Sequence, residues 1–207
     1  METRCRTRLH APASAAMVLL FVILVPSAAG HAAGTDDVPG LTAPRAAWSP
    51  GNSGIRLTRI RTTNARIRRA FVEGMSKAPT FRALAARLEA SDILIYVETG
   101  ECAIRGVRAC LTFVTRAGSM RLLRATVSLE QMQMEVVASI GHELSHAVEI
   151  AGAPEVVDVP TMKRFYEARA LFRCVPACGY ETAAARRAQI AVRTEFARWK
   201  PDSDARP

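Results

Sequence analysis

The residues best suited to chemistry in this chain are His142, Glu143 and His146. The two histidines are four residues apart, so on an α-helix they lie on one face, about 6 Å from each other. This spacing lets both imidazoles bind one metal ion, and Zn²⁺ is the ion that the pattern favours. A glutamate directly after the first histidine can take a proton from a water molecule at the metal. The pattern therefore predicts a zinc-dependent hydrolytic centre with Glu143 as general base.

The surroundings of this group favour a buried helix. Residues 138–141 and 147–148 are uncharged and small or aliphatic, as expected for a helix that holds a dry site. The chain has two other histidines, His10 and His31, and both precede the expected folded domain. A carboxylate-bridged di-iron centre would need a second Glu-x-x-His pair, and the sequence has none. The remaining alternative is a helix whose two histidines share no role.

The segment 138–148 resembles the active-site helix of the zincin metallopeptidases. The metzincin branch would need glycine at position 149 and histidine at position 152, where this chain has Glu149 and Gly152. The closer likeness is to the gluzincins, in which a glutamate on a later helix is the third zinc ligand. The resemblance implies an α+β zincin-like domain that hydrolyses peptide bonds. It also implies that substrate aligns antiparallel to an edge strand, for which we expect Met120–Val127.

Glu181 is the glutamate whose predicted position best suits the third ligand. A helix is expected over residues 181–199, and on it Glu181 shares a face with apolar residues and points toward the core. The residues of this face are Ala184, Ala185, Ala188, Val192, Phe196 and Trp199. The alternative for Glu181 is a carboxylate that is favoured only by the dipole of the first helical turn.

Glu149 competes for the same role, because it lies on the helix face of His142. Its Cα is about 4.5 Å further along the helix axis than that of His146. This favours a place beside the ligands or in the cleft, and leaves ligation by Glu149 as the alternative. Three further acids are expected in a loop or in solvent: Glu155, Asp158 and Glu167.

Tyr166 and Tyr180 are the nearest residues that can donate a hydrogen bond to the oxyanion formed during hydrolysis. The alternative for both is a half-buried packing tyrosine. The sequence contains no phosphate-binding glycine loop, dinucleotide fingerprint or Gly-x-Ser-x-Gly elbow.

The elements that must position these residues follow from the spacing of apolar residues and from proline and glycine. Helices are predicted over residues 64–75, 79–90, 130–150, 161–172 and 181–199. Strands are predicted over residues 93–97, 111–115 and 120–127, the last two as a hairpin around Ala117 and Gly118. The predicted fold is α+β, with N-terminal helices, a small mainly antiparallel sheet, the active-site helix and C-terminal helices.

Composition and charge are those of a globular chain of about one domain. It has 207 residues, 49% of them hydrophobic and 6% aromatic, which suits one core. There are 28 lysines and arginines against 19 acids, a formal net charge of +9. Such a charge can attract an anionic surface. The arginines are scattered without interleaved aromatic residues, so we expect no nucleic-acid partner.

The N-terminus has the organisation of a secretory signal peptide. Three arginines precede an uncharged, mostly aliphatic stretch, and small residues follow it. We expect cleavage after Ala29, which leaves an exported protein, periplasmic or secreted, with no stable membrane span. The alternative is an uncleaved anchor, because residues 11–30 are just long enough to span a bilayer. The predicted segments are the signal at 1–29, a flexible lead-in or short pro-segment at 30–53, the zincin-like domain at 54–199 and a disordered tail at 200–207.

The cysteines fit the same compartment. Four remain after the signal, and an even count in an exported chain favours disulfides. Three pairings are conceivable, and we expect the two that close short loops, Cys102 with Cys110 and Cys174 with Cys178. Neither pair has the spacing of a zinc knuckle.

Together these features predict an exported zinc metallopeptidase that acts on a peptide or protein substrate. Zn²⁺ is expected on His142, His146 and Glu181. The alternative is a non-catalytic exported module of the same fold, whose basic surface binds a cell-envelope partner. The sequence does not indicate an oligomeric state.

Overall fold

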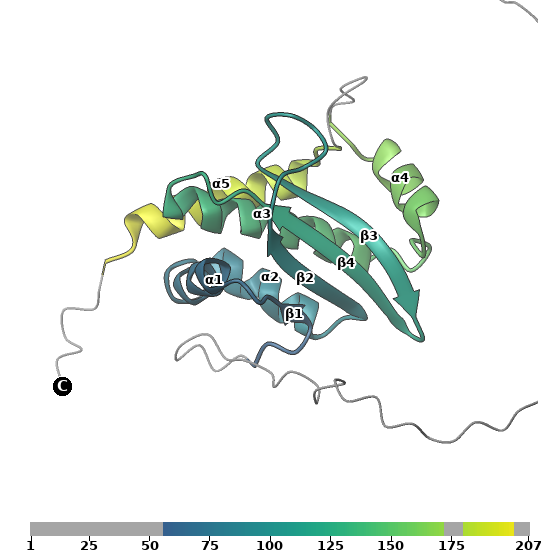
Figure 1. Ribbon diagram of the computed structural model, residues 1–207, viewed down its shortest axis with the longest axis horizontal. Coiled ribbons are helices and arrows are strands. Elements are labelled where there is room, and N and C mark those ends of the chain that lie inside the picture. The colour runs from purple at the N-terminus through teal and green to yellow at the C-terminus, as the bar shows by residue number, and fades with distance from the viewer. Residues whose placement is uncertain (1–55, 172–179, 201–207) are drawn as a thin grey trace, which may run out of the picture. The chain divides into compact units, whose positions relative to one another are not determined.

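The computed structural model describes residues 56–171 and 180–200. They form an α+β fold whose elements follow one another as Figure 1 shows. In chain order these are β1 (Ile60–Arg61), α1 (Ala65–Lys77), α2 (Pro79–Glu89), β2 (Ile93–Thr99), β3 (Ala109–Ala117), β4 (Met120–Val127), α3 (Gln133–Ala151), α4 (Val159–Glu167) and α5 (Ala183–Arg198).

Several sequence predictions fall outside the described residues. These are the signal peptide, the lead-in segment, the Cys174–Cys178 pair and residues 201–207 of the predicted tail. Among the described helices, none is both long and apolar enough to cross a membrane.

The four strands form a mixed sheet in the order β1-β2-β4-β3. β2 is parallel to both of its neighbours, and only the β3–β4 hairpin is antiparallel. The expectation of a mainly antiparallel sheet is therefore wrong. The hairpin itself is as predicted, but its second strand pairs with β2 and its first strand lies at the edge. The two-residue β1 is too short for an alternating pattern to reveal it.

β4 takes the interior position and is the more buried strand of the hairpin. Alternate residues of β4 are buried, whereas Phe113 is the single buried residue of β3. Met120–Val127 is thus hydrogen-bonded on both sides, so the expectation that it forms the edge is wrong. The edge strand next to β4 is β3.

Capping residues decide where the helices begin. Asn64 accepts hydrogen bonds from two amides of the first turn of α1, and Pro79 opens α2, both close to the predicted starts. The side chain of Asp158 caps α4, so this helix begins at Val159. The predicted helix over residues 161–172 thus starts two residues too late, and it also extends five residues too far. Thr182 caps α5, so Glu181 precedes this helix. The predicted helix over residues 181–199 starts two residues too early.

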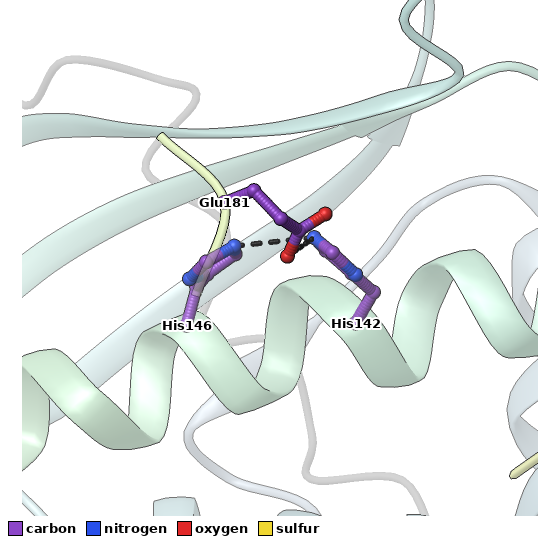
Figure 2. Close-up of side chains that lie close together, drawn as sticks. All are labelled: His142, His146 and Glu181. Carbon is purple, nitrogen blue, oxygen red and sulfur yellow. Dashed lines mark hydrogen bonds and ion pairs between the residues drawn. The ribbon is translucent and has the colours of Figure 1, made fainter. Parts of the chain in front are cut away.

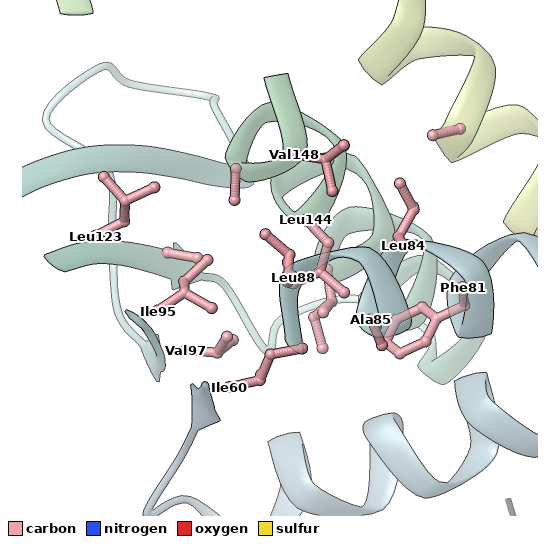
Figure 3. Close-up of a cluster of buried hydrophobic side chains, with 14 of the residues drawn as sticks. Ile60, Phe81, Leu84, Ala85, Leu88, Ile95, Val97, Leu123, Leu144 and Val148 are labelled. Atoms are coloured by element: carbon pink, nitrogen blue, oxygen red, sulfur yellow. The ribbon is translucent and has the colours of Figure 1, made fainter. Parts of the chain in front are cut away.

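The core lies between one face of the sheet and the helices (Figures 1 and 3). Ile95, Val97 and Leu123 point from the strands toward Leu88 of α2 and Leu144 of α3, and all five are fully buried. Burial of this apolar surface is the main force that holds the sheet against the helices. α3 occupies the centre, which is why its residues are buried on most sides.

α3 and α5 pack closely beside the first histidine. A Cβ atom added at Gly141 would lie 3.0 Å from Cγ2 of Val192, closer than such contacts normally occur. Glycine at this position therefore permits α5 to approach α3 next to His142.

Arg121 fastens the C-terminal end of α3 to the sheet. Its side chain is buried and donates to both carboxylate oxygens of Asp92, each at 2.7 Å. It also donates to backbone carbonyls at the end of α3 and just beyond, those of Ile150, Ala151, Ala153 and Val156. A cation at this end of a helix complements the helix dipole. The hydrogen bonds from Arg121 hold the pKa of Asp92 below its usual range.

A disulfide joins Cys102 to Cys110, as predicted, with their Cα atoms 6.0 Å apart. It closes the loop between β2 and β3. Within this loop the amide of Val107 donates to the carbonyl of Ile104 at 3.2 Å. Gly106 has φ 85°, a left-handed conformation that favours glycine. The loop is therefore a defined turn held at its ends by the disulfide.

Candidate metal centre

α3 carries both histidines of the motif on one face, as the spacing predicts. Their Nε2 atoms face each other at 3.1 Å, and the two ring planes are 76° apart (Figure 2). Two nitrogens bound to one tetrahedral Zn²⁺ at the usual bond length lie about 3.3 Å apart. The two imidazoles therefore already have the separation that a shared metal ion requires.

Glu181 completes the group from the segment that leads into α5. Its Oε1 lies 3.8 Å from Nε2 of His142, and the donor atoms of His142, His146 and Glu181 all lie within 4.8 Å of one another. The carbonyl of Glu181 accepts a hydrogen bond from the amide of Leu171 at 2.8 Å. The structure thus brings Glu181 to the histidines, but from an extended segment and not from a helix face.

The unpaired atoms of this group fit a metal ion. Oε1 of Glu181 is buried and has no hydrogen-bond partner among the described residues. Buried polar atoms are normally paired, so a carboxylate oxygen without such a partner beside two imidazole nitrogens fits a cation-binding group. The group can hold a metal ion, and its nitrogen and oxygen donors suit Zn²⁺ among others.

The second ring nitrogen of His146 is held by Glu149. Oε2 of Glu149 lies 2.9 Å from Nδ1 of His146, and its Oε1 accepts a hydrogen bond from the hydroxyl of Thr182 at 2.7 Å. A carboxylate on Nδ1 keeps the proton there and leaves the lone pair of Nε2 for a metal. The structure places Glu149 beside His146 and outside the three-residue donor group.

Thr182 was not among the residues predicted for the site. Its hydroxyl accepts a hydrogen bond from the amide of Ala185 at 3.1 Å and donates to Glu149. One side chain therefore both starts α5 directly after Glu181 and holds the partner of His146.

Burial disfavours the charged form of both histidines, and their neighbours shift the two pKa values in opposite directions. Burial, and then the charge of His146, lowers the pKa of His142 to about 4, which keeps its imidazole neutral and able to bind a metal. Burial also opposes a positive charge on His146, but the hydrogen bond to Glu149 and the nearby carboxylates outweigh it and raise the pKa of that histidine.

Glu143 is almost completely buried, at 2% exposure, and lines a cleft together with the three donor residues. Burial raises the pKa of its carboxyl group to about 7. A carboxyl group with such a pKa can both accept and release a proton near neutral pH.

Tyr166 and Tyr180 line the same cleft, and their rings are stacked with centroids 6.1 Å apart. The hydroxyl of Tyr166 donates to the backbone carbonyl of His146 at 3.1 Å. The hydroxyl of Tyr180 donates to the carboxylate of Glu167 at 3.3 Å. Both residues are thus near the centre with their hydroxyls engaged, and the oxyanion role stays a prediction.

The cleft has a volume of about 490 Å³. Residues of the disulfide-closed loop, the start of β3, α4 and Tyr180 line it. His142, Glu143, His146 and Glu181 line the same cleft. The candidate metal centre therefore lies in this cleft.

Comparison with known proteins gives no match. No family model, curated protein or solved structure is significantly similar to this chain. The likeness to the zincins therefore depends on the motif alone.

Proposed function

We propose that this protein is a zinc-dependent peptidase, with zinc on His142, His146 and Glu181 and with Glu143 as the general base. The observation that carries the proposal is the convergence of two imidazole nitrogens and one carboxylate oxygen in a cleft that a buried glutamate also lines. Two histidines, one glutamate and an open fourth position form a donor set of catalytic zinc sites.

The reaction that this geometry supports is hydrolysis of a peptide bond. Zinc at this position would acidify a water molecule and polarise the carbonyl group of the substrate. Glu143 accepts the proton of the attacking water and passes it to the leaving amine. Glu149 holds the His146 ring in place, and Thr182 holds Glu149.

We further propose that the protein acts outside the cytoplasm. The disulfide between Cys102 and Cys110 supports this, because disulfides persist in oxidising compartments. The signal-like sequence of residues 1–29 is consistent with the same route.

Metal analysis of the purified protein tests the proposal. After incubation with Zn²⁺ and removal of free metal, the wild type should hold about one zinc per chain and hydrolyse unstructured polypeptides. His146→Ala should lose both properties. Glu155→Ala, which alters an exposed acid outside the donor group, is the matched control and should keep both.

Two results would contradict the proposal. A wild-type protein that holds no zinc after incubation would remove the metal centre. Stoichiometric zinc without hydrolysis of any tested polypeptide would remove the catalytic role and favour a non-catalytic zinc-binding module.

A further inference from the structure

The cleft beside the metal centre has one distinctly apolar part. Ile104 and Val107 of the disulfide-closed loop, Leu111 of β3 and Met162 of α4 line it. The charged residues that line the cleft are Glu143 and Glu181, and both belong to the candidate centre. A ligand would therefore meet acids and histidines at the metal and aliphatic side chains beyond it.

Among residues 56–171 and 180–200, no lysine or arginine lines this cleft. The loop shows the separation residue by residue. Ile104 and Val107 are half-buried and line the cleft, whereas their neighbours Arg105 and Arg108 are exposed. The guanidinium group of Arg108 donates to the carbonyl of Glu130 at 2.9 Å, on the backbone outside the cleft. The turn thus presents its aliphatic residues to the cleft and its cations elsewhere.

This turn is held firmly enough to act as a binding surface. The hydrogen bond between Ile104 and Val107, the left-handed Gly106 and the disulfide fix its backbone. At its far end, Cys110 belongs to β3 and pairs with Thr126 of β4. The two aliphatic side chains are therefore presented by a restrained loop, which reduces the entropy that a bound ligand must overcome.

We propose that the substrate of this site is an internal stretch of polypeptide with an aliphatic side chain beside the bond that is cut. Ile104, Val107 and Met162 are the residues that determine this specificity. The proposal rests on the proposed function and names its substrate class. A free carboxylate at the end of a chain would meet no lysine or arginine among the described residues that line the cleft and would lie near Glu143 and Glu181. Cleavage within the chain is therefore favoured over removal of C-terminal residues.

Binding measurements on zinc-loaded Glu143→Gln test this class without turnover. The probes are blocked pentapeptides, acetylated and amidated, in which the central residue of a glycine host is leucine, glutamate or lysine. Transfer of a leucine side chain into an apolar site predicts about tenfold or tighter binding of the leucine peptide. The same leucine peptide with a free carboxylate directly after the leucine should bind more weakly than its amide.

Substitutions of the apolar lining residues identify which side chains determine the preference for leucine. In the Glu143→Gln background, Ile104→Lys should abolish the preference for leucine and favour the glutamate peptide. Met162→Lys should do the same from α4 and serves as a second variant if the loop does not tolerate lysine. Arg105→Glu changes the adjacent exposed residue of the same turn and should leave the preference unchanged.

The outcomes separate this proposal from the proposed function. Equal binding of the three amidated peptides, or a leucine preference that survives both lysine variants, would overturn the specificity. Tighter binding of the free carboxylate than of the amide would overturn cleavage within the chain. If Glu143→Gln binds the leucine peptide selectively but the zinc-loaded wild type hydrolyses no polypeptide, the apolar subsite is retained and the peptidase activity is rejected.

Discussion

Two groups of buried polar side chains lie against the same helix and differ in how completely they are paired. At the C-terminal end of α3, Arg121 meets the carboxylate of Asp92 and four backbone carbonyls. Near the middle of α3, two imidazoles and Oε1 of Glu181 face one another, and that oxygen has no hydrogen-bond partner among the described residues. We call the first group closed, because protein atoms pair with its charged side chains, and the second open, because one of its carboxylate oxygens has no such partner among the described residues.

The difference separates a polar group that joins elements of the fold from one that could bind a ligand. Removing a charged group from water is costly unless partners replace the water. Around Arg121 the protein supplies every partner, so this cluster joins helix to sheet. At the donor group, Glu149 and Thr182 orient His146. No cationic side chain among the described residues hydrogen-bonds to Oε1 of Glu181. The open group is the one that could hold a metal ion.

The largest effect is expected from Glu143→Gln, which changes a buried carboxyl group in the cleft of the open group and leaves its three candidate donor residues intact. If Glu143 moves protons, the rate of peptide hydrolysis should fall by about 100-fold to 10,000-fold, while zinc content and unfolding midpoint stay unchanged. Steady-state kinetics with zinc analysis measures both. Glu155→Gln is the matched control, and an unchanged rate in Glu143→Gln would reject the mechanism.

Arg121→Met tests the closed group. Loss of the guanidinium removes the Arg121 donors from Asp92 and from four backbone carbonyls, so the free energy of unfolding should fall by about 3 kcal/mol. Urea denaturation of the metal-free protein measures it. The control is Arg124→Met on the same strand, whose ion pair with Glu98 is about half exposed on both sides and should be worth less than about 1 kcal/mol. Equal losses in the two variants would contradict the distinction drawn between the groups.

Glu149→Ala tests how far the protein orients its open group. Loss of the carboxylate on His146 should weaken zinc binding by about 10-fold to 100-fold. Glu181→Ala removes a donor atom and should weaken it further. Competitive chelator titration of both variants gives the comparison. Weaker zinc binding in Glu149→Ala than in Glu181→Ala would reverse the roles and make Glu149 the ligand.

The smallest effect is expected from acid. The pKa of Asp92 is lower in the folded protein than in the unfolded chain, so the unfolded chain binds the proton more readily. The stabilisation is therefore complete above the unfolded pKa, about 3.9, and is lost as the pH falls through the lowered value. Urea midpoints of the metal-free protein across this range should fall more steeply for the wild type than for Asp92→Asn. Parallel curves would show that Asp92 does not contribute.

Local spacing was enough to predict the parts of the centre that lie on one helix. His142, Glu143 and His146 needed only a helical period, which short-range patterns reveal. The structure brings Glu181 close to the histidines, but the argument from helical phase placed it on α5 and the structure places it before α5. A threonine ahead of an alanine run is a helix N-cap signature, and Thr182 in that role would have given the correct start at Ala183.

Pairings between distant segments were not predictable in this way. Nothing in the sequence of residues 109–127 states which hairpin strand joins β2, and the choice of β4 changed both the sheet direction and the edge strand. Arg121 looked like one more surface arginine, because its partners are distant in sequence and four of them are backbone carbonyls.

The position of Glu181 in the chain also sets the order in which the centre can be assembled. A ribosome delivers the N-terminal part first, so the four strands and both histidines exist while Glu181, 35 residues after His146, is still to be made. Thr182 and α5 arrive later still. An unfinished chain that ends before residue 181 therefore has the residues of all four strands and two of the three candidate donors, but no complete donor set. The candidate donor set can be assembled only after the segment that leads into α5 has been made.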